Sequence, residues 1–167
     1  MNLHQAQEIR NGLWLGSLRA ANDVNFQLQQ HFALIIRLHN PPPTDVRRPL
    51  EVRRVLKRLQ VREYYIAIPD HPAANLSQYF DEVVRLVGQY CRVKGGVLIH
   101  CDAGISRSTT LITACLIAYN HQVGIRYPSA HHEVNDVLAE IWKKRPGIKP
   151  NPGFYQQLVA YANSLRE

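Results

Sequence analysis

Short apolar runs alternate with segments of helical periodicity along most of the chain. Apolar residues spaced at i, i+3, i+4 and i+7, as in Val52, Val55, Leu56 and Leu59, predict an amphipathic helix. Short apolar runs bounded by glycine or proline predict buried strands instead. By these criteria we expect strands at 9–15, 33–38, 64–68 and 96–99, and helices at 17–30, 52–59, 76–90, 109–119, 129–145 and 153–165.

Glycine and proline set several expected boundaries of these elements. Gly16 ends the first strand, Pro41-Pro42-Pro43 forbids continuation of the second, and Gly95-Gly96 turns the chain into the fourth. Strands alternate with helices, and helices alone close the chain. This order predicts an α/β fold with a mostly parallel central sheet flanked by helices, as a single domain over 1–167. Such sheets usually bind ligands at the carboxyl ends of their strands.

Composition narrows the class of protein. The chain of 167 residues is 46% apolar, and no apolar run approaches the roughly 20 residues of a membrane span. Three cysteines do not suggest a disulfide framework, and residues 1–12 lack the apolar core of a signal peptide. We therefore expect a cytoplasmic protein, with the nucleus also open. The net charge of +7 favours an anionic substrate, nucleic acid or a membrane surface without choosing among them.

Residues 100–108 carry the clearest candidate chemistry, because a single cysteine is followed by five residues, an arginine and a hydroxyl. The apolar run 96–99 leads into this segment, and a predicted helix follows it. Loop N–H groups and a helix N-terminus supply donors for a phosphate, and Arg107 can hold two of its oxygens. The same field favours the thiolate of Cys101, which is the nucleophilic form. The pattern predicts a phosphatase that forms a phosphocysteine intermediate.

These nine residues resemble the signature of the cysteine-dependent protein phosphatases, in the variant of the dual-specificity subfamily. Three other segments resemble that family in the right order: 12–17 its opening strand, 70–80 its acid loop and 145–154 its closing segment. The cysteine–arginine spacing alone also occurs in rhodaneses and in low-molecular-weight phosphatases, which carry it near the N-terminus. The four segments together identify the chain as resembling a stand-alone, atypical member.

The resemblance implies a role for each residue of the site. Cys101 is the expected nucleophile, Asp70 the general acid and then base, and Ser108 the hydroxyl that helps the thiolate to leave. His100 is expected to organise the loop and keep the thiolate, and Asn151 to brace the loop from behind. The residues expected to bind the phosphate are Asp102, Ala103, Gly104, Ile105, Ser106 and Arg107. No metal and no cofactor is expected.

Plain structural roles compete with these assignments: a buried thiol for Cys101, a surface ion pair for Arg107 and a solvated loop position for Asp70. Asp102 also competes with Asp70 for the role of acid, because it adjoins the nucleophile. Residues at that position in the family usually point away from the phosphate, so we expect its carboxylate to face outward. Its charge at the rim of the site would weaken or select substrates.

Three features outside the loop have alternative interpretations. The basic segment 47–62 is either a solvated face or a docking surface for an acidic partner, and without interleaved aromatic residues nucleic acid is not expected there. His131-His132-Glu133 is not expected to bind a metal, because adjacent helical residues point in different directions. Cys91 and Cys115 are expected to be core thiols, with a redox link to Cys101 left open.

The expected function is hydrolysis of phosphotyrosine and phosphoserine/threonine in phosphoprotein substrates. Hydrolysis of phosphoinositides or RNA 5′-phosphates is an alternative, as is a non-catalytic module that binds phosphoproteins. Ile105 and Ser106 add no cation to the loop, which argues against highly charged substrates. The segments 40–64 and 119–130 look extended for the family and border the site, so the substrate and the oligomeric state stay open.

Overall fold

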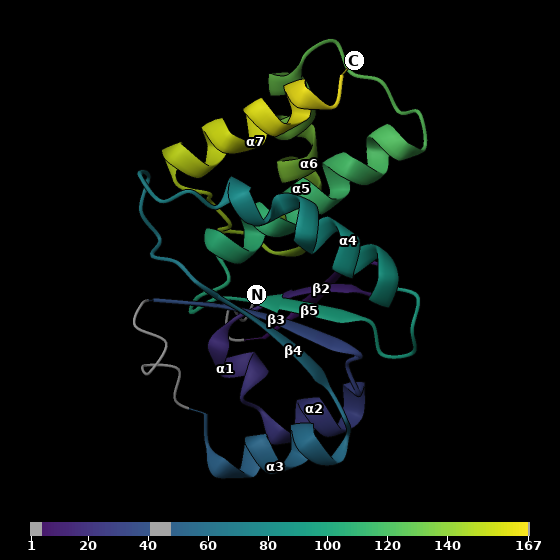
Figure 1. Cartoon of the computed structure of the whole chain (residues 1–167), viewed down its shortest axis with the longest axis vertical. Helices are drawn as coiled ribbons and strands as arrows, with labels where there is room; N and C mark the ends of the chain where they lie inside the picture. Colours follow the sequence, from purple (N-terminus) through teal and green to yellow (C-terminus); the bar gives the residue numbers. More distant parts are fainter. Residues whose placement is uncertain (1–4, 41–47, 167) are drawn as a thin grey trace.

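The computed structural model describes residues 5–40 and 48–166, and a five-stranded sheet runs through its centre (Figure 1). The strands lie in the order β1 (Gln7–Arg10), β2 (Leu13–Gly16), β5 (Val97–His100), β3 (Leu34–His39) and β4 (Arg62–Ala67). β1 pairs with β2 in the antiparallel sense, and all other neighbours pair in parallel. The predicted mostly parallel sheet is therefore confirmed, and β2, β5, β3 and β4 end at the same edge.

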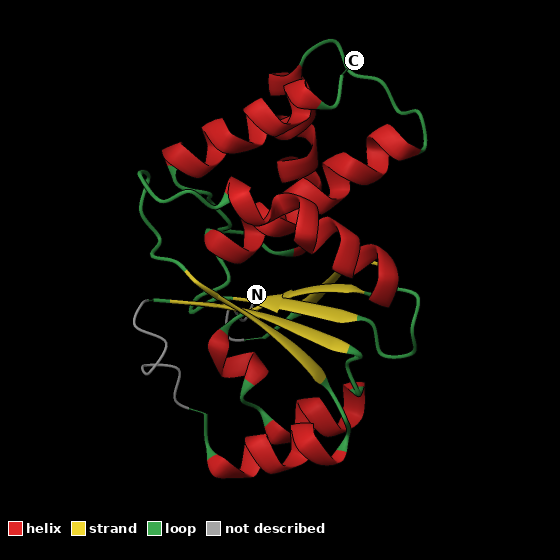
Figure 2. Cartoon of the chain, viewed as in Figure 1, coloured by secondary structure: helices red, strands yellow, loops and turns green. Residues whose placement is uncertain are grey.

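Helices cover both faces of the sheet, as Figure 2 shows. One face carries α4 (Phe80–Tyr90), α5 (Arg107–Gln122), α6 (Ala130–Lys144) and α7 (Pro152–Ser164), and the other carries α1 (Leu18–Ala21), α2 (Val24–Gln30) and α3 (Leu50–Arg58). Successive residues of a strand point to opposite faces, so Ile36 belongs to the larger core and Ile35 to the smaller one. The continuous apolar run of β3 follows from this burial on both sides.

Helix α5 connects the segment 100–108 to the larger core. Every residue from 107 to 117 is buried, because the helix packs against the sheet and against α4, α6 and α7. The hydroxyls of Thr110 and Thr113 donate to the carbonyls of Ser106 and Thr109, each at 2.7 Å, which satisfies polar groups inside the core. The segment between β5 and α5 is therefore held at both ends by buried elements.

The predicted strand at 9–15 is wrong, because the chain reverses at Asn11-Gly12 and forms the β1–β2 hairpin. Gly12 has a φ of 82°, and a Cβ there would meet the carbonyl oxygen of Cys91 at 2.0 Å. Only glycine fits that backbone and that close approach. An Asn-Gly pair between apolar residues is a strong hairpin signal, and it outweighs the apolar continuity of the run.

The predicted helix at 17–30 is also wrong, because it is two helices. Ser17 caps α1 as predicted, accepting a hydrogen bond from the Ala20 N–H, but α1 ends after one turn. Asp23 then caps α2 by accepting from the Phe26 N–H at 3.1 Å. A second capping side chain within the run offers the backbone an alternative to a continuous helix.

The remaining elements agree with the sequence in type and order. The helix predicted at 76–90 opens with a 3₁₀ turn, η2 (Ser77–Tyr79), and the cap predicted at Ser129 accepts from the His132 N–H. Pro41-Pro42-Pro43 and Arg47 lie outside the described residues. None of the helices within residues 5–40 and 48–166 combines the length and the apolar character of a membrane span.

Candidate active site

The segment 101–106, here the Cys101 loop, turns its backbone carbonyls outward. Each of five successive carbonyls accepts a hydrogen bond, and four residues supply the donors. The pairs are Cys101 O with His100 Nδ1 (3.2 Å), Asp102 O with Leu18 N (2.9 Å), Ala103 O with Arg145 Nη2 (2.9 Å), Gly104 O with Arg145 Nε (3.0 Å) and Ile105 O with Lys149 N (2.9 Å).

This arrangement leaves the loop N–H groups for a ligand. In a trans peptide the C=O and N–H point to opposite sides, so the N–H groups of 102–106 point away from those outer partners. None of these five N–H groups donates to another residue in the described part of the chain. Together with the N-terminus of α5, they form a concave set of donors suited to an anion.

Gly104 permits the tight curl of the loop. Its φ is 70°, and a Cβ would meet the carbonyl oxygen of Gly16 at 2.6 Å and Arg145 Nη2 at 2.8 Å. Any side chain here would displace either the strand end or the arginine that holds the loop. The thiol of Cys101 lies at the start of the curl, 3.0 Å from the hydroxyl of Ser108, and both residues are buried.

Arg107 is buried at the mouth of the loop, and its guanidinium is held on several sides. Nη1 donates to Asn40 Oδ1 at 2.8 Å and to the carbonyl of Ile68 at 3.0 Å. Nη2 donates to Asp102 Oδ2 at 3.2 Å, whereas Nε has no hydrogen-bond partner among the described residues. Asp102 was expected to face outward. Its side chain is 56% exposed, but its carboxylate lies against Arg107 because that unneutralised guanidinium attracts it.

Asp70 joins the Cys101 loop to the closing segment. Its Oδ1 accepts from the Ser106 hydroxyl and from Asn151 Nδ2, both at 2.8 Å, and Ser106 in turn accepts from the Asn151 N–H at 3.0 Å. The second oxygen of Asp70 has no hydrogen-bond partner in the described structure. Asn151 also caps α7 by accepting from the Phe154 N–H. The structure thus brings Asp70, the loop and Asn151 together from segments far apart in sequence.

His100 is fully buried between the loop and Arg37. Arg37 Nη1 lies 3.2 Å from His100 Nε2, and a guanidinium only donates, so Nε2 is the unprotonated acceptor. The ring proton therefore sits on Nδ1 and is donated to the carbonyl of Cys101. Burial, reinforced by the charge of Arg37, lowers the pKa of His100 to about 3, so the ring is neutral.

The neutral state of His100 should make the free energy of unfolding depend on pH. Between pH 6.5 and about 3 the unfolded chain binds a proton at His100 that the folded chain does not. The free energy of unfolding should therefore fall with acidification over this range, by up to about 1.4 kcal/mol per pH unit from this group. In His100→Gln that contribution is absent, so the stability advantage of the wild type should shrink as the pH falls. Urea unfolding across this pH range measures the difference, and the exposed His131→Gln is the control. A constant difference would contradict a buried neutral ring.

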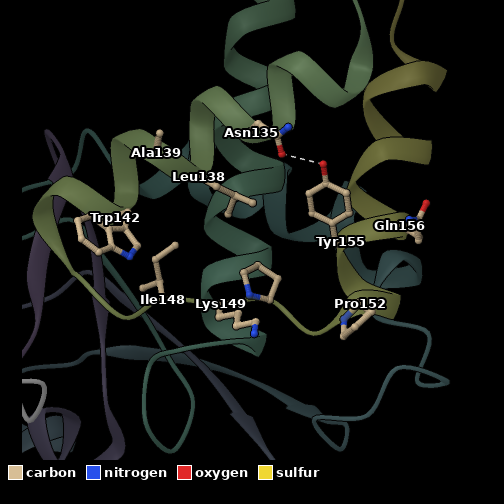
Figure 3. A pocket seen from close by; sticks show the side chains of 10 residues that line it. Asn135, Leu138, Ala139, Trp142, Ile148, Lys149, Pro152, Tyr155 and Gln156 are labelled. Atoms are coloured by element: carbon tan, nitrogen blue, oxygen red, sulfur yellow. Dashed lines mark hydrogen bonds between the residues drawn. The ribbon is translucent and has the colours of Figure 1, made fainter.

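A groove of about 500 Å³ lies between α6 and α7, with Trp142 on one wall and Tyr155 on the other (Figure 3). The Tyr155 hydroxyl donates to Asn135 Oδ1 at 2.7 Å and links the two helices. Ile148, Lys149, Pro150 and Pro152 border the groove, and the N–H of Lys149 binds the Cys101 loop. No residue of 101–107 lines the groove, so it is distinct from the site formed by the Cys101 loop.

The other two cysteines lie away from the site. Cys91 and Cys115 line a cavity of about 970 Å³ together with Gly96, which precedes β5, whereas Cys101 follows the same strand. Burial raises the pKa of the Cys115 thiol to about 12, so this group stays protonated and unreactive. All three thiols are free. The geometry gives no support to a redox link with Cys101.

His131-His132-Glu133 does not converge on a point. Glu133 is buried and binds His121 Nε2 at 2.8 Å and Asn120 Nδ2 at 3.3 Å, whereas His131 and His132 are exposed. Within the described ranges, no three His, Cys, Asp or Glu side chains gather in a way that could hold a metal ion.

The basic segment predicted at 47–62 is largely an exposed face of α3. Arg48 instead forms an ion pair with Glu63. In the part of the chain that the structure describes, the exposed cations of α3 have no ion-pair partner. These cations are Arg53, Arg54, Lys57 and Arg58.

Sequence reasoning missed two buried arginines that support the loop. Arg145 was noted only within the closing segment, yet it binds two loop carbonyls and also the carbonyl of Gln5 at 2.7 Å. Arg37 stands within an apolar run, and a charged residue in a buried strand requires a partner. That signal was available in the sequence, although the identity of the partner was not.

Comparison with known proteins agrees with this geometry. Human dual specificity protein phosphatase 15 is 35% identical over 152 residues, which cover 90% of this chain and 43% of that protein. Mouse dual specificity protein phosphatase 18 is 39% identical over 105 residues, which cover 60% of this chain and 50% of that protein. The chain thus spans half or less of the length of these two relatives.

The fold and the matched segment extend over most of the chain. The crystal structure of the Yvh1 phosphatase domain from Chaetomium thermophilum matches with a TM-score of 0.78 and 26% identity, covering 95% of this chain and 96% of that one. The profile of the family described as "Dual specificity phosphatase, catalytic domain" matches residues 13–164, from the start of β2 to the end of α7. The chain therefore belongs to the dual specificity phosphatase family.

Proposed function

We propose that the protein is a cysteine-dependent phosphatase that hydrolyses phosphate monoesters of proteins. The observation that carries the proposal is the Cys101 loop. Five backbone N–H groups, none with an acceptor within 5–40 and 48–166, curl beside a thiol, and the Arg107 guanidinium stands at the mouth with Nε likewise unpartnered in those ranges. A dianionic phosphate monoester fits this set of donors by both charge and shape.

In the first step the Cys101 thiolate attacks phosphorus and the bond to the leaving oxygen breaks. Asp70, through Oδ2, which no described residue binds, gives the leaving group a proton, so an alcohol or phenol departs. The loop N–H groups and Arg107 stabilise the equatorial oxygens of the transferring phosphoryl group. The product is a phosphocysteine on Cys101.

In the second step water attacks the phosphocysteine and Asp70, now a carboxylate, accepts its proton. The phosphorus–sulfur bond breaks, and inorganic phosphate forms. The leaving thiolate receives a hydrogen bond from Ser108, whose hydroxyl lies 3.0 Å from the sulfur. No metal or cofactor takes part in either step, because the loop and Arg107 already supply the charge stabilisation.

Asp102 bears on the choice of substrate. Its carboxylate adds a negative charge beside Arg107, and residues 105 and 106 are an isoleucine and a serine. Additional phosphates on a ligand would meet this carboxylate rather than a cation, which disfavours phosphoinositides and RNA 5′-triphosphates. Phosphotyrosine and phosphoserine/threonine peptides carry a single phosphate and are the proposed substrates.

A substrate panel tests this choice. We expect release of inorganic phosphate from phosphotyrosine and phosphothreonine peptides at rates well above those from phosphoinositides or an RNA 5′-triphosphate. A faster rate on either polyphosphorylated ligand would assign the protein to that class instead. Binding of the peptides with no turnover of any ligand would support a phosphoprotein-binding module.

The basic face of α3 and the cellular compartment complete the proposal. The exposed arginines and lysine of α3 suit an acidic segment of a partner protein. A nucleophilic thiol requires reducing conditions, for which the cytoplasm, or the nucleus, is the proposed setting.

A further inference from the structure

Arg37 is a buried charged residue on β3, an internal strand of the sheet. It lies on β3 and pairs in register with His100 on β5 and with Tyr65 on β4. Its side chain is only 1% exposed. Burying a guanidinium is costly, and an apolar residue would extend the run formed by Ile35, Ile36 and Leu38 without that cost. Local packing alone therefore does not explain the arginine.

The contacts of Arg37 lead directly to the nucleophile. Nη1 reaches His100 Nε2 at 3.2 Å, and the opposite ring nitrogen of His100 reaches the carbonyl of Cys101 at 3.2 Å. Only one tautomer satisfies both contacts, because the guanidinium cannot accept and the carbonyl cannot donate. Arg37 thus selects the protonation state in which His100 holds the backbone of Cys101.

A carboxylate on the neighbouring strand holds the guanidinium. Glu63 Oε1 accepts from Arg37 Nε at 2.9 Å and also binds Arg48, and its other oxygen accepts from the Tyr65 hydroxyl at 3.0 Å. The hydrogen bond from Arg37 Nε to Glu63 holds the guanidinium from β4, which lies on the other side of β3 from the strand of His100. The chain of contacts runs from the sheet edge through Glu63, Arg37 and His100 to the carbonyl of Cys101.

We propose that Arg37 is a positioning residue for the nucleophile, held by Glu63 and acting through His100 on the backbone of Cys101. Fixing the Cys101 carbonyl also orients the N–H of Asp102, which belongs to the same peptide and is the first of the five loop donors. The proposal rests on the proposed function for its effect on turnover. Its effect on the histidine tautomer does not depend on activity.

Three variants separate the effect of the hydrogen bond to His100 from the effects of the Arg37 charge and of binding to Glu63. Arg37→Met removes the donor and the charge, whereas Arg37→Gln keeps a donor that can reach toward His100 without the charge. Arg48→Met is the matched control, because Arg48 binds the same carboxylate as Arg37 but makes no hydrogen bond to His100. Thermal unfolding verifies that each variant is folded.

Turnover of an aryl phosphate gives the first readout. Loss of a residue that orients a site through a second residue commonly costs about 10-fold or more in activity. We expect Arg37→Met to lower kcat by about that factor with little change in KM, because a displaced nucleophile slows chemistry more than binding. Arg37→Gln should recover part of the loss, and Arg48→Met should match the wild type. Equal kcat in all variants would overturn the proposal.

Nitrogen NMR of the imidazole rings gives the second readout, with the signals of His100 assigned by their loss in His100→Gln. In the wild type we expect the proton on Nδ1. In Arg37→Met we expect the Nε2-protonated form to appear and the ring to titrate nearer its ordinary pKa. The groups facing His100 are Arg37 and His39 on β3, Arg48, and Cys101.

The two readouts keep the proposal distinct from the proposed function. An inactive wild type would refute the proposed function, yet the NMR of Arg37→Met would still decide whether Arg37 sets the tautomer. If Arg37→Met fails to fold, Arg37→Leu carries the test, because leucine also lacks a donor for His100 Nε2. An unchanged tautomer in the folded donor-free variant would overturn the role of Arg37 whatever its activity.

Discussion

Cys101→Ser is expected to lower turnover of an aryl phosphate by about 10⁴-fold or more, as loss of a catalytic nucleophile typically does. A serine hydroxyl is a far weaker nucleophile than a thiolate. The N–H groups of the loop stabilise an anionic nucleophile, and a serine hydroxyl stays protonated and neutral. The fold should survive, because sulfur and oxygen differ little in size and the 3.0 Å contact with Ser108 can be retained.

Cys91→Ser is the control for Cys101→Ser. Cys91 is partly exposed at the end of α4 and lies away from the site. A thiol-alkylating agent can therefore reach Cys91 as well as Cys101. This variant should keep full turnover and should still lose it on alkylation. Turnover of Cys101→Ser within about tenfold of the wild type, a difference of only about 1.4 kcal/mol in barrier, would remove Cys101 from the mechanism.

Asp70→Asn should slow phosphoserine peptide hydrolysis by about 10²–10⁴-fold, the usual contribution of a general acid. An asparagine oxygen can still accept from Ser106 and Asn151, so the geometry around Oδ1 is kept while the transferable proton is lost. An activated coumarin phosphate has a good leaving group and needs that proton less. Its hydrolysis should therefore fall much less, and the basic limb of the pH–rate profile, which reports the acid, should flatten.

Asp102→Asn is the matched control for the acid. It removes a carboxylate next to the nucleophile that binds Arg107 rather than the Ser106–Asn151 pair. We expect the substitution to change the hydrolysis rates of substrates with good and with poor leaving groups by the same factor. Phosphate should bind more tightly, because the carboxylate that competes for Arg107 is gone. If Asp102→Asn shows the leaving-group dependence and Asp70→Asn does not, the two carboxylates have been assigned the wrong way round.

The parts of the molecule that depend on local sequence were predictable. A strand, a glycine-containing curl and a helix start are specified within 96–109, so the placement of the nucleophile followed from neighbours in sequence. The breaks at Asn11-Gly12 and Asn22-Asp23, which divide the predicted strand at 9–15 and the predicted helix at 17–30, also depend on local sequence. Apolar periodicity alone does not predict them, because they follow from turn and cap chemistry.

The supports of the loop could not be predicted in the same way. Arg145 reaches Gly104 across 41 residues, and Arg37 reaches His100 across 63. Such pairs depend on which elements the tertiary fold brings together, and no spacing in the sequence encodes that. The turn of Asp102 toward Arg107 likewise depends on the guanidinium being buried beside an open rim.

The anchors of the loop also set the order in which a working site can arise during synthesis. The nucleophile and its five donors lie within 101–106, but the bonds to Ala103, Gly104 and Ile105 come from Arg145 and Lys149. A chain emerging from the ribosome holds the thiol some forty residues before the groups that shape its cradle, since translation runs from the N-terminus. The nascent chain therefore carries a Cys101 loop that is not yet held in shape, and catalytic competence is expected only after residues 145–149 have been synthesised.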